Sequence, residues 1–158
     1  THPFSYHNDP GKTREAYNDR GWATVGDIGQ VDADGFLYLT DRKSNMIISG
    51  GVNVYPQETE NVLISHPKVF DVAVIGTPHA DFGEEVRAVV QLEPGVEASP
   101  ALAQELIAFC RLQLSAIKSP RVIDFRDSLP REPNGKLLKR LLREQYRAQA
   151  QQAGLAAG

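Results

Sequence analysis

The spacing of apolar and polar residues in the first third of the chain favours short strands rather than long helices. Residues 21–40 hold two strand-like runs on either side of the turn sequence DADG, which predicts a β-hairpin. NMIIS at 45–49 is a further short run, and the two glycines at 50–51 allow a tight backbone turn after it. Residues 1–20 are polar and lack a periodic apolar pattern, so they predict loop with a short helix near 10–18.

From Pro56 onward the pattern changes to a mixture of helices and strands. Proline at the first helical position and the early Glu58 favour a helix that begins at Pro56 and ends at Pro67. The later elements are predicted from their apolar periods: strands VFDVAVIGTP, VRAVVQL and RVIDF, and helices at 99–115 and 137–147. The order helix, strand, strand, helix, strand, helix predicts an α+β domain in which helices pack on a three-stranded sheet.

A change of composition near residues 41–45, where the strand pair gives way to DRKSN, predicts a domain boundary. We expect a first segment at 1–43, a globular domain at 44–147, and a frayed tail rich in Ala and Gln at 148–158. The chain begins at Thr1 rather than at a methionine, so we expect it to be a piece cut from a longer protein.

The composition is that of an ordinary globular protein, with 41% hydrophobic and 23% charged residues. No apolar run approaches the length that crosses a bilayer, so we expect no transmembrane segment. Cys110 is the one cysteine, which excludes an internal disulfide and a cysteine-based zinc site, and favours a reducing, cytoplasmic compartment. The four histidines show no metal-ligand spacing, and we predict no metal site.

The charges are distributed unevenly along the chain. Residues 111–147 carry ten Lys or Arg against four Asp or Glu, an excess of +6, whereas the remainder carries −9, which together give the net charge of −3. A basic end on an acidic protein favours a local anionic partner, and a solvated helix face is the simpler alternative. Aromatic residues interleaved with the basic ones, as in proteins that stack on bases, are missing, so we expect no nucleic-acid binding.

Four motifs follow one another between residues 20 and 147. They are GWATVGDIG, DGFLYLTDRKSNMIISGGVNVYPQETE, DVAVIGTPHADFGEE and LPREPNGKLLKR. The set resembles the carboxyl end of adenylate-forming acyl-CoA synthetases, a superfamily that includes luciferase, and is most similar to its acyl- and aryl-CoA ligase branch. The resemblance implies an enzyme that uses Mg-ATP to convert a carboxylate to acyl-AMP and then passes the acyl group to the thiol of CoA.

The resemblance also implies two domains with separate tasks. In such enzymes a large N-terminal domain carries the phosphate loop and the acyl pocket, and a small C-terminal lid rotates between the half-reactions. Residues 1–43 resemble the end of the large domain, and 44–147 resemble the lid. The implied partners are the large domain, ATP or AMP, CoA and a carboxylic acid, and the exposed N-terminal segment offers a surface for oligomerisation. The chain by itself should be inactive.

Four positions match residues that serve the adenylation step or the hinge in this family. Asp27 matches an acid that accepts hydrogen bonds from the ribose hydroxyls, although Val25 stands beside it where many relatives have Thr. Arg42 matches an arginine on the ribose and phosphate side of the nucleotide. Ser44 stands at the hinge, where relatives usually have Asp or Lys. Lys136, carried by an Asn-Gly bend, matches the lysine that reaches the α-phosphate during adenylation.

Five further positions match the path of CoA. Gly50 and Gly51 match a loop that lines the pantetheine tunnel in the second step. Phe82 matches an aromatic residue on the adenine of CoA, and Lys118 and Arg121 match cations on its phosphates. Simpler interpretations stay open, because a glycine pair suits any tight turn and Phe82 would also serve as a packing residue.

Two other functions remain as alternatives to a CoA ligase. An adenylating enzyme of the same superfamily would load its acyl group onto the thiol of a carrier protein, or oxidise it as luciferase does. A non-catalytic binding module would retain only the fold of the lid. The joint presence of Lys136, Asp27 and the glycine pair favours the enzyme over the binding module.

Overall fold

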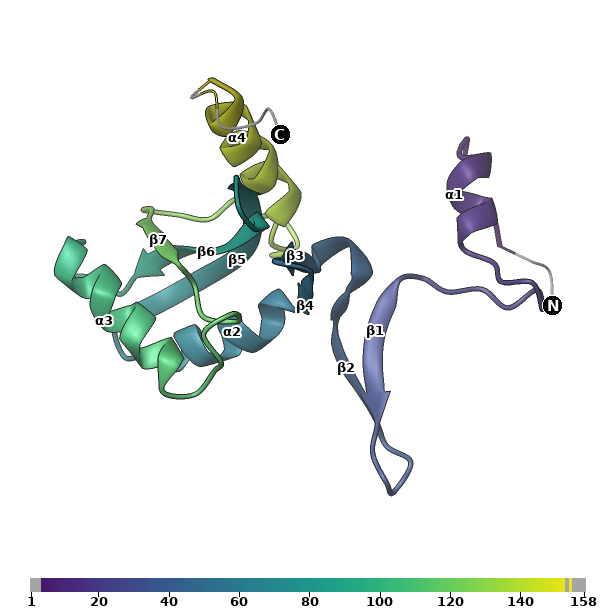
Figure 1. Ribbon diagram of the computed structural model, residues 1–158, viewed down its shortest axis with the longest axis horizontal. Coiled ribbons are helices and arrows are strands. Elements are labelled where there is room, and N and C mark those ends of the chain that lie inside the picture. The colour runs from purple at the N-terminus through teal and green to yellow at the C-terminus, as the bar shows by residue number, and fades with distance from the viewer. Residues whose placement is uncertain (1–3, 153, 155–158) are drawn as a thin grey trace. The chain divides into compact units, whose positions relative to one another are not determined.

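The computed structural model describes residues 4–152 and 154. The chain forms two compact units, the first ending at Ser44 and the second beginning at Asn45. Their helices and strands are labelled in Figure 1. Among the described helices, none is long and apolar enough to span a bilayer.

The first unit contains a short helix and a β-hairpin. Its elements are α1 (Pro10–Glu15), β1 (Asp27–Val31) and β2 (Leu37–Arg42), and the 3₁₀ helix η1 (Lys43–Asn45) crosses the division between the units. Asp9 starts α1 by accepting a hydrogen bond from the N–H of Lys12. Asp32 closes the hairpin by accepting from the N–H groups of Asp34 and Phe36. The hairpin predicted around DADG is therefore confirmed.

The second unit is an α+β domain, as the order of elements predicts. Its elements are β3 (Ile47–Ser49), β4 (Val52–Val54), α2 (Pro56–Ile64), β5 (Val69–His79), β6 (Gly83–Leu92), α3 (Pro100–Arg111), β7 (Val122–Phe125) and α4 (Lys139–Gln152). The strands lie in the order β4-β3-β6-β5, and β7 pairs with β6 in parallel. β5 and β6 form an antiparallel ladder that runs from Val69↔Leu92 to His79↔Gly83.

The sheet has five strands, so the predicted number of three is wrong. The two additional strands are β3 and β4, which form a hairpin that joins β6 where Ser49 pairs with Gly83. Next to this pairing, the N–H of Ile48 donates to the carboxylate of Glu84 at 3.0 Å. The hairpin thus reaches β6 through this bridge and the carboxylate of Glu84, and it adds the buried side chains of Ile47 and Val54 to the core; its short apolar runs do not indicate these tertiary contacts.

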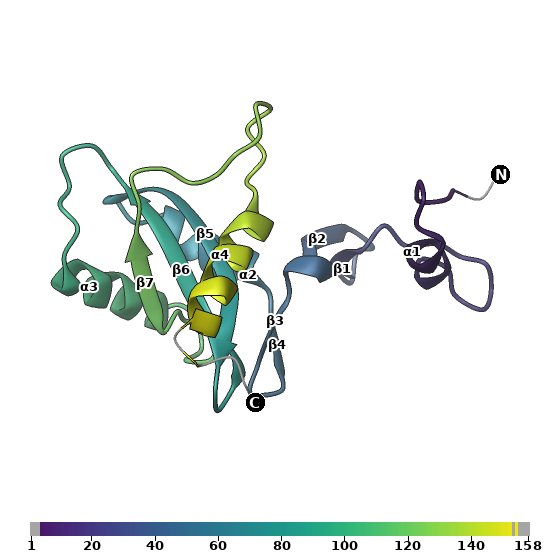
Figure 2. The ribbon, with the colours of Figure 1, turned by 90° about the horizontal axis from the view of Figure 1, so that it is seen from above.

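Helices cover both faces of this sheet (Figure 1 and Figure 2). The larger core lies between the sheet and α2 and α3, and its buried residues include Leu63, Val72, Val74, Val86, Ala88, Val90, Leu102, Leu106, Cys110 and Ile123. The smaller core lies under α4 and contains Ala73, Ile75, Val89, Leu129 and Leu142. Because side chains alternate along a strand, burial on both faces produces the continuous apolar run of β5.

The last helix is longer than its apolar pattern predicts. α4 continues to Gln152, so residues 148–152, predicted to be part of a frayed tail, are helical. The remaining tail positions, apart from residue 154, lie outside the described residues.

Candidate functional site

The two residues predicted to hold the nucleotide lie opposite each other in the first unit. Asp27 and Arg42 are cross-strand partners at the end of the β1–β2 ladder, and the Nε atom of Arg42 lies 3.2 Å from Oδ1 of Asp27. The arginine side chain is 60% exposed and the aspartate side chain 34%. The pair therefore presents both an acceptor for hydroxyl groups and a cationic donor to solvent.

A basic hollow of about 580 Å³ lies beside this pair, within the first unit. Its lining residues are Tyr6, Lys12, Glu15, Ala16, Thr24, Val25, Gly26, Arg42, Lys43 and Ser44. Ser44, the predicted hinge residue, is the last residue of this unit. Three cations against one glutamate make the hollow suitable for an anionic ligand.

The glycine pair forms the turn between β3 and β4. Gly50 and Gly51 have φ angles of +55° and +79°, and this is the two-residue turn that favours glycine because both central residues are left-handed. The N–H of Gly50 donates to the carbonyl of Phe82 at 2.9 Å. A Cβ atom at Gly51 would meet no atom within 4 Å, so the space directly beside its Cα is open. The backbone conformation of the turn therefore explains both glycines, and the space beside Gly51 is open.

Two further residues predicted to bind CoA, Phe82 and Arg121, come together next to this turn. The guanidinium carbon of Arg121 lies 4.0 Å from the ring centre of Phe82, whose carbonyl accepts the bond from Gly50. The ring of His79 also lies against Phe82, with centroids 4.9 Å apart. Arg121 is exposed and Phe82 half-buried. The ring therefore supports the arginine, whose donor groups remain available to solvent.

Lys118, the fifth residue of the predicted CoA set, is engaged elsewhere. Its ammonium lies 2.5 Å from Oε2 of Glu58 on α2, and its carbonyl accepts a bond from the hydroxyl of Thr59 at 2.8 Å. These two contacts hold the segment before β7 against α2. Lys118 consequently has a structural role in this conformation.

Lys136 lies near the tip of an ordered loop between β7 and α4. Gly135, with a φ of +87°, donates to the carbonyl of Glu132 at 2.8 Å, and Asn134 accepts from the N–H of Lys136 at 3.0 Å. Arg131 pairs with Leu137 across the loop in an isolated bridge. Lys136 is exposed, and among the described residues its ammonium has no hydrogen-bond or ion-pair partner. The bend predicted at Asn-Gly is therefore confirmed, and it presents a free cation.

The segment from α2 to the Lys136 loop matches a known family model. The match covers residues 58–136, and the model is described as the AMP-binding enzyme C-terminal domain. The chain belongs to this family.

Curated relatives and a solved structure place the AMP-binding C-terminal domain within longer proteins. The chain is 45% identical over 143 residues to "Long-chain-fatty-acid--CoA ligase FadD13" of Mycobacterium tuberculosis, a match that covers 90% of the chain and 27% of the relative. It is 44% identical over 137 residues to "Fatty acid--[acyl-carrier-protein] ligase ScoC" of Streptomyces coeruleorubidus, covering 87% and 26%. The crystal structure of ATP-bound MatB from Rhodopseudomonas palustris is similar with a TM-score of 0.78 and 38% identity, over 88% of this chain and 27% of that one. The chain thus spans about a quarter of the length of these relatives.

Two polar contacts of this C-terminal domain were not predicted from the sequence. Glu60 and Lys139 form a buried ion pair at 2.7 Å, and Glu60 also accepts the N–H of Val74 at 2.6 Å. The sequence does contain an indication that Glu60 is buried, because its position on α2 shares the helical spacing of the buried Thr59 and Leu63. The second contact joins Arg131 to Asp71 across sixty residues, and no local pattern indicates it.

A polar cluster ties α4 to the sheet of this domain. Arg87 on β6 reaches Asp124 at 2.8 Å and Glu85 at 2.9 Å, and the hydroxyl of Tyr146 donates to Asp124 at 2.6 Å. Burial and the bond to Asp124 raise the pKa of Tyr146 to about 12. Burial lowers the pKa of Arg87, but its carboxylate partners outweigh that effect and leave the pKa raised. In the described part of the chain, no group of three or more His, Cys, Asp or Glu residues is placed to hold a metal ion.

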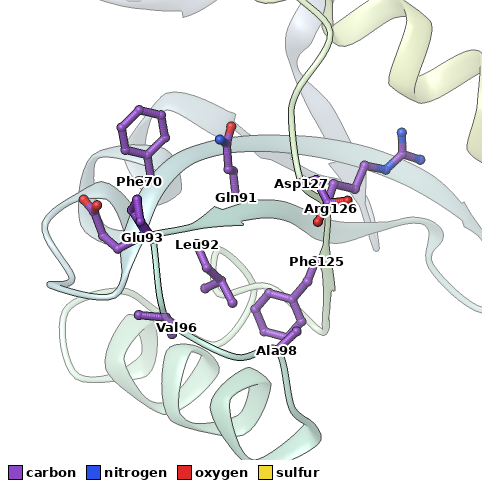
Figure 3. A pocket seen from close by; sticks show the side chains of 10 residues that line it. Phe70, Gln91, Leu92, Glu93, Val96, Ala98, Phe125, Arg126 and Asp127 are labelled. Atoms are coloured by element: carbon purple, nitrogen blue, oxygen red, sulfur yellow. The ribbon is translucent and has the colours of Figure 1, made fainter.

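The hollow shown in Figure 3 contains none of the predicted site residues. It has a volume of about 460 Å³ and is lined by Phe70, Gln91, Leu92, Glu93, Pro94, Val96, Ala98, Phe125, Arg126 and Asp127. Leu92, Val96 and Phe125 also pack against the larger core, and in Figure 3 they lie on the side of α3. The hollow is therefore the open end of that core, at the ends of β6 and β7.

Proposed function

We propose that this chain is the C-terminal lid of an enzyme that activates a carboxylic acid with ATP and transfers the acyl group to CoA. The observation that carries the proposal is the unpartnered, exposed Lys136 at the tip of a hydrogen-bonded loop, in a chain that belongs to the AMP-binding C-terminal domain family. The name of the FadD13 relative, a long-chain fatty acid CoA ligase, supports the reaction class.

In the first half-reaction the carboxylate attacks the α-phosphorus of ATP, and pyrophosphate leaves. Negative charge accumulates on the α-phosphate oxygens, and a compact ammonium such as that of Lys136 would stabilise it. Asp27 would accept hydrogen bonds from the ribose hydroxyls, and Arg42, already beside it, would orient that carboxylate and face the phosphates. The ATP-bound MatB structure supports nucleotide use.

In the second half-reaction the CoA thiol attacks the acyl carbonyl, and AMP leaves. The open space at Gly51 would admit the pantetheine chain. The exposed guanidinium of Arg121 would bind CoA phosphates, with Phe82 as its support rather than as an adenine platform, because Arg121 covers that ring. Lys118 would have to leave Glu58 to take part, so Arg121 is the first candidate.

The exposed hairpin of the first unit supports a large N-terminal domain as partner. Val31, Leu37 and Leu39 are each more than 60% exposed, and apolar residues gathered on one hairpin are typical of a surface that another domain covers. We assign residues 1–43 to that domain, 44–147 to the lid, and Ser44 to the hinge between them. Because ATP and CoA are the substrates, we assign the enzyme to the cytoplasm.

A chimera tests the proposal. Residues 1–158 replace the matching part of the FadD13 relative, and the half-reactions are measured separately, as pyrophosphate exchange and as CoA-dependent consumption of preformed acyl-AMP. Lys136→Ala should slow pyrophosphate exchange about a hundred- to a thousandfold and spare the transfer to CoA. Gly51→Leu should do the reverse. Gly95→Leu is the matched control, because Gly95 has a similar φ of +85° and equally open space. Equal loss in both halves for Lys136→Ala would refute the assignment.

A carrier-protein thiol is the second candidate acceptor. The ScoC relative, named as a fatty acid–[acyl-carrier-protein] ligase, is nearly as similar to this chain as the FadD13 relative. Offering the chimera CoA and a phosphopantetheinylated carrier protein separately decides between them. Arg121→Ala should reduce the use of CoA alone, since only free CoA has nucleotide phosphates.

A further inference from the structure

A continuous chain of polar contacts connects strand β5 with the peptide bond that precedes Lys136. Oδ1 of Asp71, on β5, accepts the N–H of Val72 at 2.9 Å, which fixes that carboxylate on its own strand. Oδ2 of Asp71 accepts from Nε and Nη2 of Arg131 at 3.1 and 2.6 Å. The third guanidinium nitrogen of Arg131, Nη1, donates to the carbonyl of Gly135 at 2.5 Å. A single guanidinium therefore joins the sheet to the loop tip.

The rest of the loop is fixed from within. The N–H of Glu132 donates to the carbonyl of Lys136 at 2.9 Å, and the amide of Asn134 donates to the carboxylate of Glu132 at 3.1 Å. The N–H of Leu138 donates to the carbonyl of Pro130 at 2.8 Å, closing the base. These bonds shape the loop, and among the hydrogen bonds of the described residues only those of Arg131 connect its tip to β5. The backbone of Lys136 is thus held while its ammonium stays free.

We infer that Asp71 and Arg131 are positioning residues that hold Lys136 where it meets the developing charge of the adenylation step. The inference rests on the proposed function of Lys136. A charged group contributes to a transition state chiefly when it is already in place, and a misplacement of about 1 Å can cost about a hundredfold in rate. The Arg131 side chain is 40% exposed and the Asp71 side chain 17%, so breaking this partly exposed pair should leave the domain folded. A purely structural role would then leave the rate unchanged.

Amide hydrogen exchange in the 158-residue chain tests the mechanical part. Arg131→Met should accelerate exchange at the N–H groups of Gly135 and Lys136 about tenfold or more, because they open locally once the tip is released. Arg140→Met is the matched control, since Arg140 also bonds a carboxylate, Glu144 at 2.7 Å, on the exposed face of α4. Unchanged exchange at Gly135 and Lys136 in Arg131→Met would overturn the inference, whatever the enzyme assays give.

The chimera tests the chemical part. Arg131→Met should lower kcat for pyrophosphate exchange about ten- to a hundredfold, leave the KM for ATP nearly unchanged, and spare the transfer to CoA. Arg131→Lys should not restore the rate, because an ammonium cannot bridge Asp71 and Gly135 as a guanidinium fork does. Full rescue by Arg131→Lys would show that charge alone suffices and would overturn the bridge.

A double variant separates this inference from the proposed function. If Arg131 acts through Lys136, Arg131→Met should have no further effect on pyrophosphate exchange in a Lys136→Ala background. The same fold loss in both backgrounds would overturn the inference and leave the role of Lys136 intact. Normal exchange in Lys136→Ala itself would instead refute the proposed function, and the amide measurement would still decide whether Arg131 holds the loop.

Discussion

Two antiparallel strand pairs in this chain illustrate opposite ways of using the same local structure. The β5–β6 pair and the β1–β2 pair are both antiparallel, and each has a glycine with positive φ at its connection: Gly83 directly follows the β5–β6 turn, and Gly35 lies within the β1–β2 turn. In β5–β6, residues on both faces are buried between helices. In β1–β2, Val31, Leu37 and Leu39 remain more than 60% exposed. Strand pairing by itself therefore does not produce a core.

The difference shows where the stability of the chain resides. Apolar burial contributes roughly 25 cal/mol per Å², so the two-sided packing of β5–β6 should dominate the free energy of unfolding. The β1–β2 pair has its backbone bonds and the Asp32 turn, and a two-stranded hairpin by itself is marginal in water. One region is a scaffold for the Lys136 loop, and the other offers a surface for a partner.

Hydrogen exchange gives the strongest test of this difference in stability between β5–β6 and β1–β2. The N–H groups within 72–76 and 86–90 that bond across the β5–β6 ladder should open only with the whole second unit, whereas those of the β1–β2 ladder within 28–31 and 37–40 should open locally. Exchange in a dilute sample of the chain should therefore be at least about a thousandfold slower in β5–β6 than in β1–β2. Equal protection of both pairs would show that the first unit has a stability of its own, and the comparison would fail.

Two ion pairs, one buried in the second unit and one exposed in the hairpin of the first, allow the stability of the two regions to be compared through the same kind of interaction. Lys139→Met removes the ammonium that contacts the carboxylate of Glu60, which is only 9% exposed, and should destabilise the second unit by about 3–5 kcal/mol. Arg42→Met breaks the exposed pair with Asp27 in the hairpin and should cost less than about 1 kcal/mol. Urea unfolding followed by circular dichroism measures both, with Arg140→Met as an exposed control. Similar costs for the two pairs would contradict the burial argument.

A smaller effect concerns the contact between α4 and the sheet. Because the pKa of Tyr146 is raised to about 12, the unfolded phenol loses its proton between pH 10 and 12 while the folded one keeps it. Stability should therefore fall as the pH rises through this window, and the fall should be about 1–2 kcal/mol smaller in Tyr146→Phe. Urea unfolding at pH 10, 11 and 12 gives the two slopes. Parallel slopes would mean that burial and the bond to Asp124 do not keep the phenol protonated.

The elements with strong local signals were predictable from the sequence. The DADG hairpin, the strands of β5 and β6 and the proline-initiated helices follow from apolar period and turn chemistry, which are properties of neighbouring residues. The strand β4, VNV, was not predicted, because three residues carry too short a period and its pairing depends on the turn at 50–51. The length of α4 was also underestimated, since its last turns are polar and only the structure shows them helical.

In the candidate site, too, the features set by neighbouring residues were predictable, and those set by tertiary packing were not. The bend that presents Lys136 follows from Asn134 and Gly135, which are adjacent in sequence. The contact of Arg121 with Phe82 joins residues thirty-nine positions apart. It depends on the pairing of β6 with β7, which the local sequence does not indicate. The preference of Lys118 for Glu58 likewise depends on how α2 packs. The roles of these residues in binding ATP and CoA stay predictions.

The carboxylates along β5 have a consequence for solubility. β5 lies at the edge of its sheet, and unpaired N–H groups on an edge strand invite a strand from another molecule. Here the N–H of Val72 is taken by Asp71 and the N–H of Val74 by Glu60. An incoming strand would have to displace two charged acceptors, one of them buried, before it could form its first bonds. A long, apolar edge strand is thereby protected against intermolecular aggregation by side chains of its own domain.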